Sequence, residues 1–211
     1  MKVILKPGGF VVVGTLVVLG IFGAVKVLSP RPEPSGPSES PQAKPPVSVS
    51  GQKPLTGASL IDPTRQGWSL ATQKPAAATM KLQVSPELPA GSQHSLHLEV
   101  TTVDPNKYWC AQLLKKVPQA VEGNHNLTVQ FWGRSVKKTA VYVVFEEGLS
   151  PHTAELQKNV RLTPEWRQYQ FPFRTTKDHT DTHANFCIKA GLEVGEIEIA
   201  NMHVVDNGKA S

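Results

Sequence analysis

The sequence predicts an all-β domain, a two-layer sandwich or jelly roll, preceded by one apolar helix and a proline-rich segment. Past residue 57, apolar residues alternate with polar ones at a period of two, and turn residues interrupt the pattern at short intervals. No window of 12 residues there shows a capped 3.6-residue period. The chain has 211 residues, enough for one domain of about 150 residues and additional N-terminal segments.

The N-terminal segment 8–25 is apolar and uncharged over 18 residues. At ~1.5 Å per residue it spans ~27 Å, and with Val27 and Leu28 it can cross a hydrocarbon core of ~30 Å. Lys2 and Lys6 precede it and favour a cytoplasmic N-terminus. We expect residues 1–28 to be a cytoplasmic stub and transmembrane signal anchor. A cleaved signal peptide and a buried core helix are the alternatives, and Lys26 at the expected cleavage site argues against the first.

Residues 29–56 form a second segment of distinct composition, with eight prolines among Ser, Glu, Gln and Lys. Such a stretch cannot bury enough apolar surface to offset its ordering entropy, so we expect a disordered, extended linker. At ~3.1 Å per residue, the 25 residues from 30 to 54 could act as a stalk of up to ~75 Å. An incidental linker is equally compatible with this composition.

The remaining residues, 57–207 with a short tail at 208–211, carry the strands. In 94–101, for example, Leu96, Leu98 and Val100 share one face. The expected strands are 94–101, 108–114, 126–134, 139–147, 159–162, 168–173, 185–190 and 196–205. Eight or more short strands in ~150 residues favour a sandwich.

Charge and cysteine content exclude several classes of protein. The net charge is +5, but residues 1–56 hold six basic and two acidic side chains, whereas 57–211 hold sixteen and fifteen. The folded part is therefore nearly neutral and lacks the charge expected of a nucleic-acid-binding domain. Two cysteines are too few for a disulfide-rich scaffold, and no Cys/His spacing typical of a structural zinc site occurs.

The aromatic landmarks and their order resemble the CenC-type carbohydrate-binding modules of galactose-binding-like fold. The matching pieces are GWSL at 67–70, HSLHLEV at 94–100, YWCAQL at 108–113, EGNHNLTVQFWGRS at 122–135, AVYVVFEEG at 140–148, LTPEWRQYQFPF at 162–173, NFCIKAG at 185–191 and GEIEIANMHVVD at 195–206. The resemblance implies a jelly roll in which one concave sheet can cradle a glycan.

The resemblance also implies where that glycan would bind. Binding positions of family members fall on Tyr108, Tyr142, Asn185 and Lys189, and strand parity adds Gln112 and Glu146 to the same faces. An aromatic ring offers a flat apolar surface to a sugar ring, and amides and charges bond its hydroxyl groups. Alternatively, the two tyrosines are ordinary half-buried strand residues.

The other large aromatic residues divide between core and surface. Family members repeat large residues at the positions of Trp68, Trp109, Phe131 and Trp166, so we expect these in the core. Trp132 alternates with the apolar residues of its strand. It belongs either to a glycan-binding platform or to the outer convex face.

Two structural features implied by the resemblance stay open. Many relatives carry an Asp in the last strand and often a structural calcium ion, but this chain has Ala200, Asn201 and Met202 there. Calcium could still bind through Asp62 or Asp206 with backbone carbonyls; no other cofactor is expected. Cys110 and Cys187 fall on one face in the implied arrangement, as a disulfide or as two free thiols.

The sequence does not indicate an enzyme. The densest cluster of residue types that bind metals is His179, Asp181 and His183. Their Thr-rich segment, however, is typical of an exposed loop. Glu146 and Glu147 are adjacent, so a strand directs them to opposite faces. No nucleophile elbow or phosphate-binding loop occurs.

We therefore expect a membrane-anchored, non-catalytic carbohydrate-binding module that holds poly- or oligosaccharide at the cell envelope. Its C-terminal domain would lie outside the cytoplasm, in the periplasm or at the cell surface. The alternative is a structural or protein-binding β-sandwich of an envelope assembly, with no sugar site and an unknown protein partner.

Overall fold

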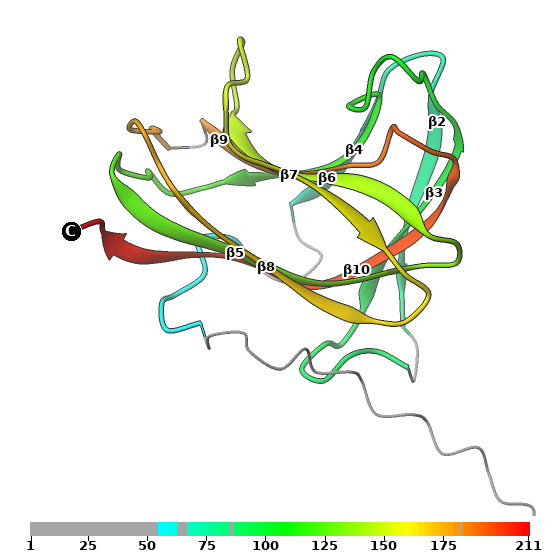
Figure 1. Ribbon diagram of the computed structural model, residues 1–211, viewed down its shortest axis with the longest axis horizontal. Helices are drawn as coiled ribbons and strands as arrows, with labels where there is room; N and C mark the ends of the chain where they lie inside the picture. The colour runs from blue at the N-terminus through cyan, green and yellow to red at the C-terminus, as the bar shows by residue number, and fades with distance from the viewer. Residues whose placement is uncertain (1–54, 63–66, 85–86, 182) are drawn as a thin grey trace, which may run out of the picture. The chain divides into compact units, whose positions relative to one another are not determined.

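A computed structural model of the protein describes residues 55–62, 67–84, 87–181 and 183–211. The described residues form two antiparallel sheets and no helix (Figure 1), which confirms the predicted β-sandwich. The expected apolar helix and proline-rich linker lie outside the described residues. Within the described part, no helix has the length and apolar character needed to span a bilayer.

Each sheet has five strands. The first sheet runs in the order β1 (Trp68–Thr72), β4 (Ala111–Val117), β9 (Ala184–Lys189), β6 (Thr139–Glu147) and β7 (Ala154–Leu162). The second runs in the order β2 (Ala77–Gln83), β3 (Ser95–Thr102), β10 (Gly195–Lys209), β5 (His125–Ser135) and β8 (Arg167–Arg174). In Figure 1, β6, β7 and β9 of the first sheet lie above β5, β8 and β10 of the second.

The central core fills the space between the sheets. Alternation along each strand supplies one inward residue in two, as in β5, where Leu127, Val129 and Phe131 are fully buried. Aromatic rings join the layers: Phe145 of β6 packs 5.2 Å from Phe173 of β8, centroid to centroid. The core thereby fixes which side chains of the first sheet face outward.

All eight predicted strands are present, and two more were missed. β1 and β2 are strands at the edges of their sheets, and apart from Trp68 their inward residues, such as Leu70 and Met80, are only partly buried, so their alternation is weak. The expected strand at 108–114 begins only at Ala111. A turn precedes it, because Lys107 N donates to the carbonyl of Asp104 (2.9 Å) and Cys110 N to that of Lys107 (2.8 Å).

The predicted core positions of the aromatic residues are correct in part. Trp68 and Phe131 belong to the central core. Trp109 does not: it lies in the turn before β4 and is 36% exposed, so this prediction is wrong.

Trp166 and Trp132 are buried in a separate cluster with Ala200, against which Leu88 packs. Leu88 comes from the connection between β2 and β3, which covers the outer face of the second sheet at this point. Trp132 thus lies on the outer face of the second sheet, the second of the two alternatives, and is covered there rather than exposed as a platform. It is on the opposite sheet from the other candidate site residues.

Candidate functional site

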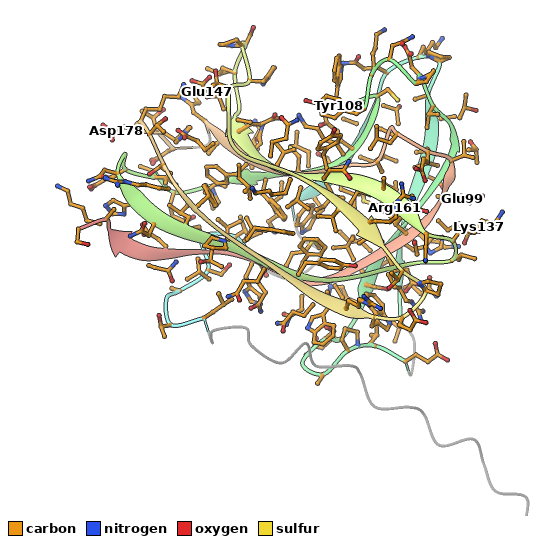
Figure 2. All side chains as sticks on the ribbon, viewed as in Figure 1. Glu99, Tyr108, Lys137, Glu147, Arg161 and Asp178 are labelled. Atoms are coloured by element: carbon orange, nitrogen blue, oxygen red, sulfur yellow. The ribbon has the colours of Figure 1, made fainter. Side chains whose placement is uncertain are left out.

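A groove of about 370 Å³ lies on the outer face of the first sheet. The turn before β4 forms one wall and the β6–β7 connection forms the other. Figure 2 labels Tyr108 and Glu147, which lie toward opposite ends of this face. The groove is lined by Gln73, Tyr108, Trp109, Gln112, Leu114, Glu146, Pro151, His152, Ala154, Gln157, Asn185 and Lys189.

Strand register gathers the predicted residues on this face. Gln112 of β4 pairs with Lys189 of β9, which pairs with Tyr142 of β6. Asn185 of β9 pairs with Glu146 of β6. The structure therefore brings together all six residues expected from the resemblance and from strand parity, and all except Tyr142 line the groove.

A buried ion pair forms part of the groove floor. Lys189 Nζ lies 2.6 Å from Glu146 Oε2, and the two side chains are 8% and 7% exposed. The other carboxylate oxygen, Oε1, lies 3.6 Å from Cys187 Sγ. Burial, and next the negative charge of Glu146, raise the pKa of the Cys187 thiol far above its usual value. Cys187 is thus a fully buried, protonated thiol rather than a nucleophile.

Two buried acceptor atoms in the groove have no hydrogen-bond partner in the protein: Gln112 Oε1 and Asn185 Oδ1. An unsatisfied buried polar atom costs about 1–3 kcal/mol, so native proteins rarely leave one without a protein, water or ligand partner. Both atoms come from adjacent central strands, β4 and β9. They are suited to accept hydrogen bonds from hydroxyl groups of a molecule in the groove.

Aromatic rings form the wall beside these acceptors. The Tyr108 ring lies 4.6 Å from that of Tyr142 and 4.9 Å from that of Trp109, centroid to centroid. Lys189 Nζ is 5.7 Å from the centroid of the Tyr108 ring. Tyr108 OH donates a long hydrogen bond, 3.5 Å, to Gln157 Oε1.

Sequence analysis missed Trp109 as a site residue. The signal that could have found it is the preceding Asp-Pro-Asn at 104–106, a combination typical of turns. A turn there places Trp109 outside the strand alternation and frees its ring to face solvent. Pro151 and His152 were also missed, because a loop's position over a sheet face leaves no periodic signal in the sequence.

The two residues considered for calcium each face a basic side chain. Lys115 Nζ donates to the backbone carbonyl of Asp62 (2.7 Å), and Asp206 Oδ2 lies 2.8 Å from His125 Nδ1. Within the described ranges, no group of three or more His, Cys, Asp or Glu side chains has a metal-binding arrangement.

Cys110 and Cys187 are free and buried, not bridged. Cys110 lies in the turn before β4, whereas Cys187 pairs with Leu114, inside that strand. Leu114 is three residues from Ala111, where β4 begins, which is ~10 Å at ~3.3 Å per residue and exceeds the ~4.4–6.8 Å between Cα atoms that a disulfide needs. Cys110 Sγ instead lies 3.7 Å from the carbonyl of Gly191.

The segment 178–183 is not wholly the exposed loop that was expected. His179 is buried, and its Nε2 lies 3.1 Å from Glu155 Oε1. Its ring also packs edge-on against Phe145 at 5.8 Å. Asp181 is exposed, and the His183 ring contacts Thr180, so the three residues do not converge on one point.

Glu146 and Glu147 have different partners, as their adjacency predicts. Glu146 forms an ion pair with Lys189 in the groove, whereas Glu147 Oε1 lies 2.5 Å from Lys177 Nζ. The Lys177 ammonium, and next hydrogen bonds from Thr153, lower the pKa of Glu147 to about 2. The two carboxylates cannot act together on one bond.

No protein-family profile matches the sequence, and no curated protein matches it significantly. Solved structures do match. A CBM4 carbohydrate-binding module aligns with a TM-score of 0.53 at 15% identity, covering 66% of this chain and 86% of that one.

Two further matches extend this result. The N-terminal cellulose-binding domain of β-1,4-glucanase C from Cellulomonas fimi has a TM-score of 0.51 at 12% identity. The alignment covers 75% of this chain and 99% of that one. An arabinose-bound MgGH51 α-L-arabinofuranosidase gives 0.52 at 13% identity, covering 72% of this chain and 26% of that one. At these identities the likeness shows a shared β-sandwich fold.

Proposed function

We propose that the groove on the first sheet binds a glycan. The observation that carries the proposal is the placement of two unpartnered buried acceptors, Gln112 Oε1 and Asn185 Oδ1, in a groove walled by Tyr108 and Trp109. Sugars combine hydroxyl donors with apolar C–H faces, and this groove offers a partner to each. The likeness of the fold to a CBM4 module and to a cellulose-binding domain supports the same conclusion.

The Glu146–Lys189 ion pair would complete the site. Each partner neutralises the charge of the other, so the floor suits an uncharged polar ligand. The carboxylate and ammonium groups retain further hydrogen-bonding capacity for hydroxyl groups. Recognition would then combine one polar floor with one aromatic wall.

We propose that binding is not followed by hydrolysis. Glycoside hydrolysis commonly requires two carboxyl groups, and Glu146 is the one carboxylate among the described residues that line the groove. That carboxylate is occupied by Lys189.

The finer features of the proposal rest on the sequence. The landmarks at 67–206 favour a CenC-type module with a jelly-roll sandwich of galactose-binding-like fold. The segment at 8–25 would anchor it in the membrane, and the linker at 29–56 would extend it from the bilayer into the periplasm or the cell surface. The test of the anchor is fractionation of the full chain: we expect it in the membrane with its N-terminus intact, and a soluble form beginning near Ser29 would contradict this.

A structural or protein-binding role is the second candidate. It predicts a large exposed aliphatic patch. Within the described residues, the exposed large aliphatic side chains are Leu82 and Val84 at the end of β2, Leu149 in the β6–β7 connection, and Val136 and Val194, which line one depression. We therefore place glycan binding first.

Affinity electrophoresis of the full chain in mild detergent, against gels containing different soluble polysaccharides, tests the proposal. We expect retardation by at least one polysaccharide, reduced in Asn185→Ala and Gln112→Ala. Gln130→Ala, on the outer face of the second sheet, is the matched control and should be retarded like the parent. Unchanged mobility of the folded parent in every gel would overturn the proposal.

A further inference from the structure

We propose that a second pocket, on the outer face of the second sheet, binds a small organic molecule that carries a primary ammonium group. This pocket lies on the opposite sheet from the groove, and its role does not depend on glycan binding. Its volume is about 300 Å³. It is lined by Gln83, His97, Arg134, Ser135, Val136, Pro164, Glu196 and Glu198.

Strand register gathers the charged side chains of this pocket. His97 of β3 pairs with Glu198 of β10, which pairs with Arg134 of β5. In the next row on the same face, Glu99 of β3 pairs with Glu196 of β10. The residues that alternate with them in β3 and β10 belong to the core, so these side chains face outward.

One of the two carboxylates in the lining already has its partners. Arg134 Nε and Nη2 lie 3.1 and 2.9 Å from Glu198 Oε1, and Ser95 Oγ donates to Glu198 Oε2 (3.0 Å). The guanidinium group also contacts Glu87 (3.1 Å) and lies over the Trp166 ring. The charge of Arg134 is therefore neutralised by these carboxylates, and its network forms a fixed wall of the pocket.

The other carboxylate, Glu196, carries a negative charge next to a second one. Its side chain is 49% exposed. It stands directly opposite Glu99 in the antiparallel pair, and like charges in this arrangement destabilise a sheet. A cation bound beside Glu196 would relieve this repulsion.

Two lysines are near enough to consider as partners of these glutamates. Lys137 lines a depression together with Glu99 and Glu196, and Figure 2 labels Lys137 and Glu99. Lys81 pairs in register with His97. Among the residues that the structure describes, neither lysine forms an ion pair with Glu99 or Glu196. The two carboxylates thus keep their attraction for a cation.

His97 provides a second, independent observation. It is 7% exposed, and its buried Nδ1 has no hydrogen-bond partner among the described residues. Its Nε2 lies 3.5 Å from Glu196 Oε2, so in the neutral imidazole Nε2 carries the hydrogen and Nδ1 is an acceptor. A buried acceptor requires a donor. An ammonium group has three donors and no acceptor, so it can bond both the ring and a carboxylate.

The rest of the lining indicates what the ammonium group is attached to. Val136 and Pro164 supply apolar surface, and Val136 is 66% exposed. The volume is at the lower end of the ~300–1,000 Å³ typical of small-molecule sites. Because no group of three or more His, Cys, Asp or Glu side chains in the described ranges is arranged to hold a metal ion, the pocket suits a short alkylammonium ion instead.

Saturation-transfer NMR on the full chain in deuterated mild detergent tests this proposal. The probe is 1-aminobutane, 1-butanol is its uncharged match, and detergent alone is the blank. At about pH 8 a primary amine is charged, so we expect the amine to bind at least about fivefold more tightly than the alcohol. Equal affinity for the two compounds would overturn the proposal.

Variants locate the bound amine. Glu196→Gln and His97→Phe should each weaken amine binding by about three- to tenfold. Glu196 is half-exposed, so its variant should fold and carries the test even if His97→Phe does not fold. Asp181→Asn removes the same charge at an exposed position elsewhere and is the control. Unchanged amine binding in Glu196→Gln, or an equal loss in Asp181→Asn, would overturn the proposal.

The groove variants separate this pocket from the proposed function. Gln112→Ala and Asn185→Ala should leave the affinity for 1-aminobutane unchanged, because both residues belong to the first sheet. A loss in either variant would place the amine in the groove and overturn the second pocket. Failure of every polysaccharide to bind would reject the glycan site and leave the result for the amine unaffected.

Discussion

At the bottom of the groove, Lys189 and Glu146 occupy positions from which water is almost excluded. A charge in such a place is tolerated because its partner is within hydrogen-bond distance, and removing one partner leaves the other uncompensated. The pair therefore fixes the floor of the site as well as its polarity.

Replacing Lys189 by Met tests this at a single residue. We expect Lys189→Met to lower the free energy of unfolding by about 3–5 kcal/mol, because Glu146 is left buried without a partner. The double variant Lys189→Met/Glu146→Gln should recover part of this loss. Urea denaturation of the three proteins measures both quantities, and a loss in the single variant below about 1 kcal/mol would contradict the account.

A second residue-scale prediction concerns His125 and pH. The hydrogen bond to Asp206 is the largest cause that raises the pKa of His125. A raised folded-state pKa means that the stabilisation is fully present below the unfolded value of about 6.5 and is lost as pH rises through the folded value. The stability difference between the parent and His125→Gln should therefore shrink from about pH 5.5 to pH 8.5. Denaturation midpoints across this range measure it, and a difference that grows with pH would contradict the assignment.

Individual residues also show how far the sequence could predict the site. Parity placed Gln112 and Glu146 on the face of the residues that the resemblance implied, because side chains of a paired strand alternate between two faces and one of these faces is the core. Parity failed for Trp109 because it lies in the turn before β4, where side chains do not alternate between two faces. Trp132 was ambiguous because the sequence does not reveal which loop covers an outer face.

Among the elements, the connection between β2 and β3 buries aromatic side chains on the outer face of the second sheet. Leu88 from this connection packs on Trp132 and Trp166, and the Arg134 guanidinium carbon lies 4.8 Å from the centroid of the Trp166 ring. The outer face of the second sheet is thereby covered at this point, whereas the outer face of the first sheet holds the groove. Strand patterns alone do not distinguish two such faces.

Truncation of Trp166 tests the contribution of this cluster. We expect Trp166→Ala to lower the free energy of unfolding by about 3–5 kcal/mol, as for a large core aromatic residue, although it lies outside the central core. Tyr108→Ala is the comparison and should cost less, since Tyr108 is only half-buried. Thermal or urea unfolding measures both, and a smaller loss in Trp166→Ala than in Tyr108→Ala would show that the cluster contributes little.

Over the whole molecule, the sandwich follows from the number and spacing of its strands, but the strand order does not. The order β1-β4-β9-β6-β7 joins segments that are far apart in the sequence, such as β4 (Ala111–Val117) and β9 (Ala184–Lys189). The sequence pattern indicates on which face a side chain lies but not which strands are neighbours, so it could not predict that Cys187 pairs with Leu114. The groove depends on that same register and on two loops that flank it.

Protection of Trp109 from a fluorescence quencher tests the central claim most directly, because it reports both binding and its location. Trp109 is 36% exposed, whereas Trp68, Trp132 and Trp166 are 7–8% exposed, so acrylamide should quench mainly Trp109. With a polysaccharide that retards the full chain, we predict a lower quenching constant in the parent and no change in Trp109→Phe. Retardation by that polysaccharide with an unchanged quenching constant in the parent, or equal protection in Trp109→Phe, would contradict glycan binding in this groove.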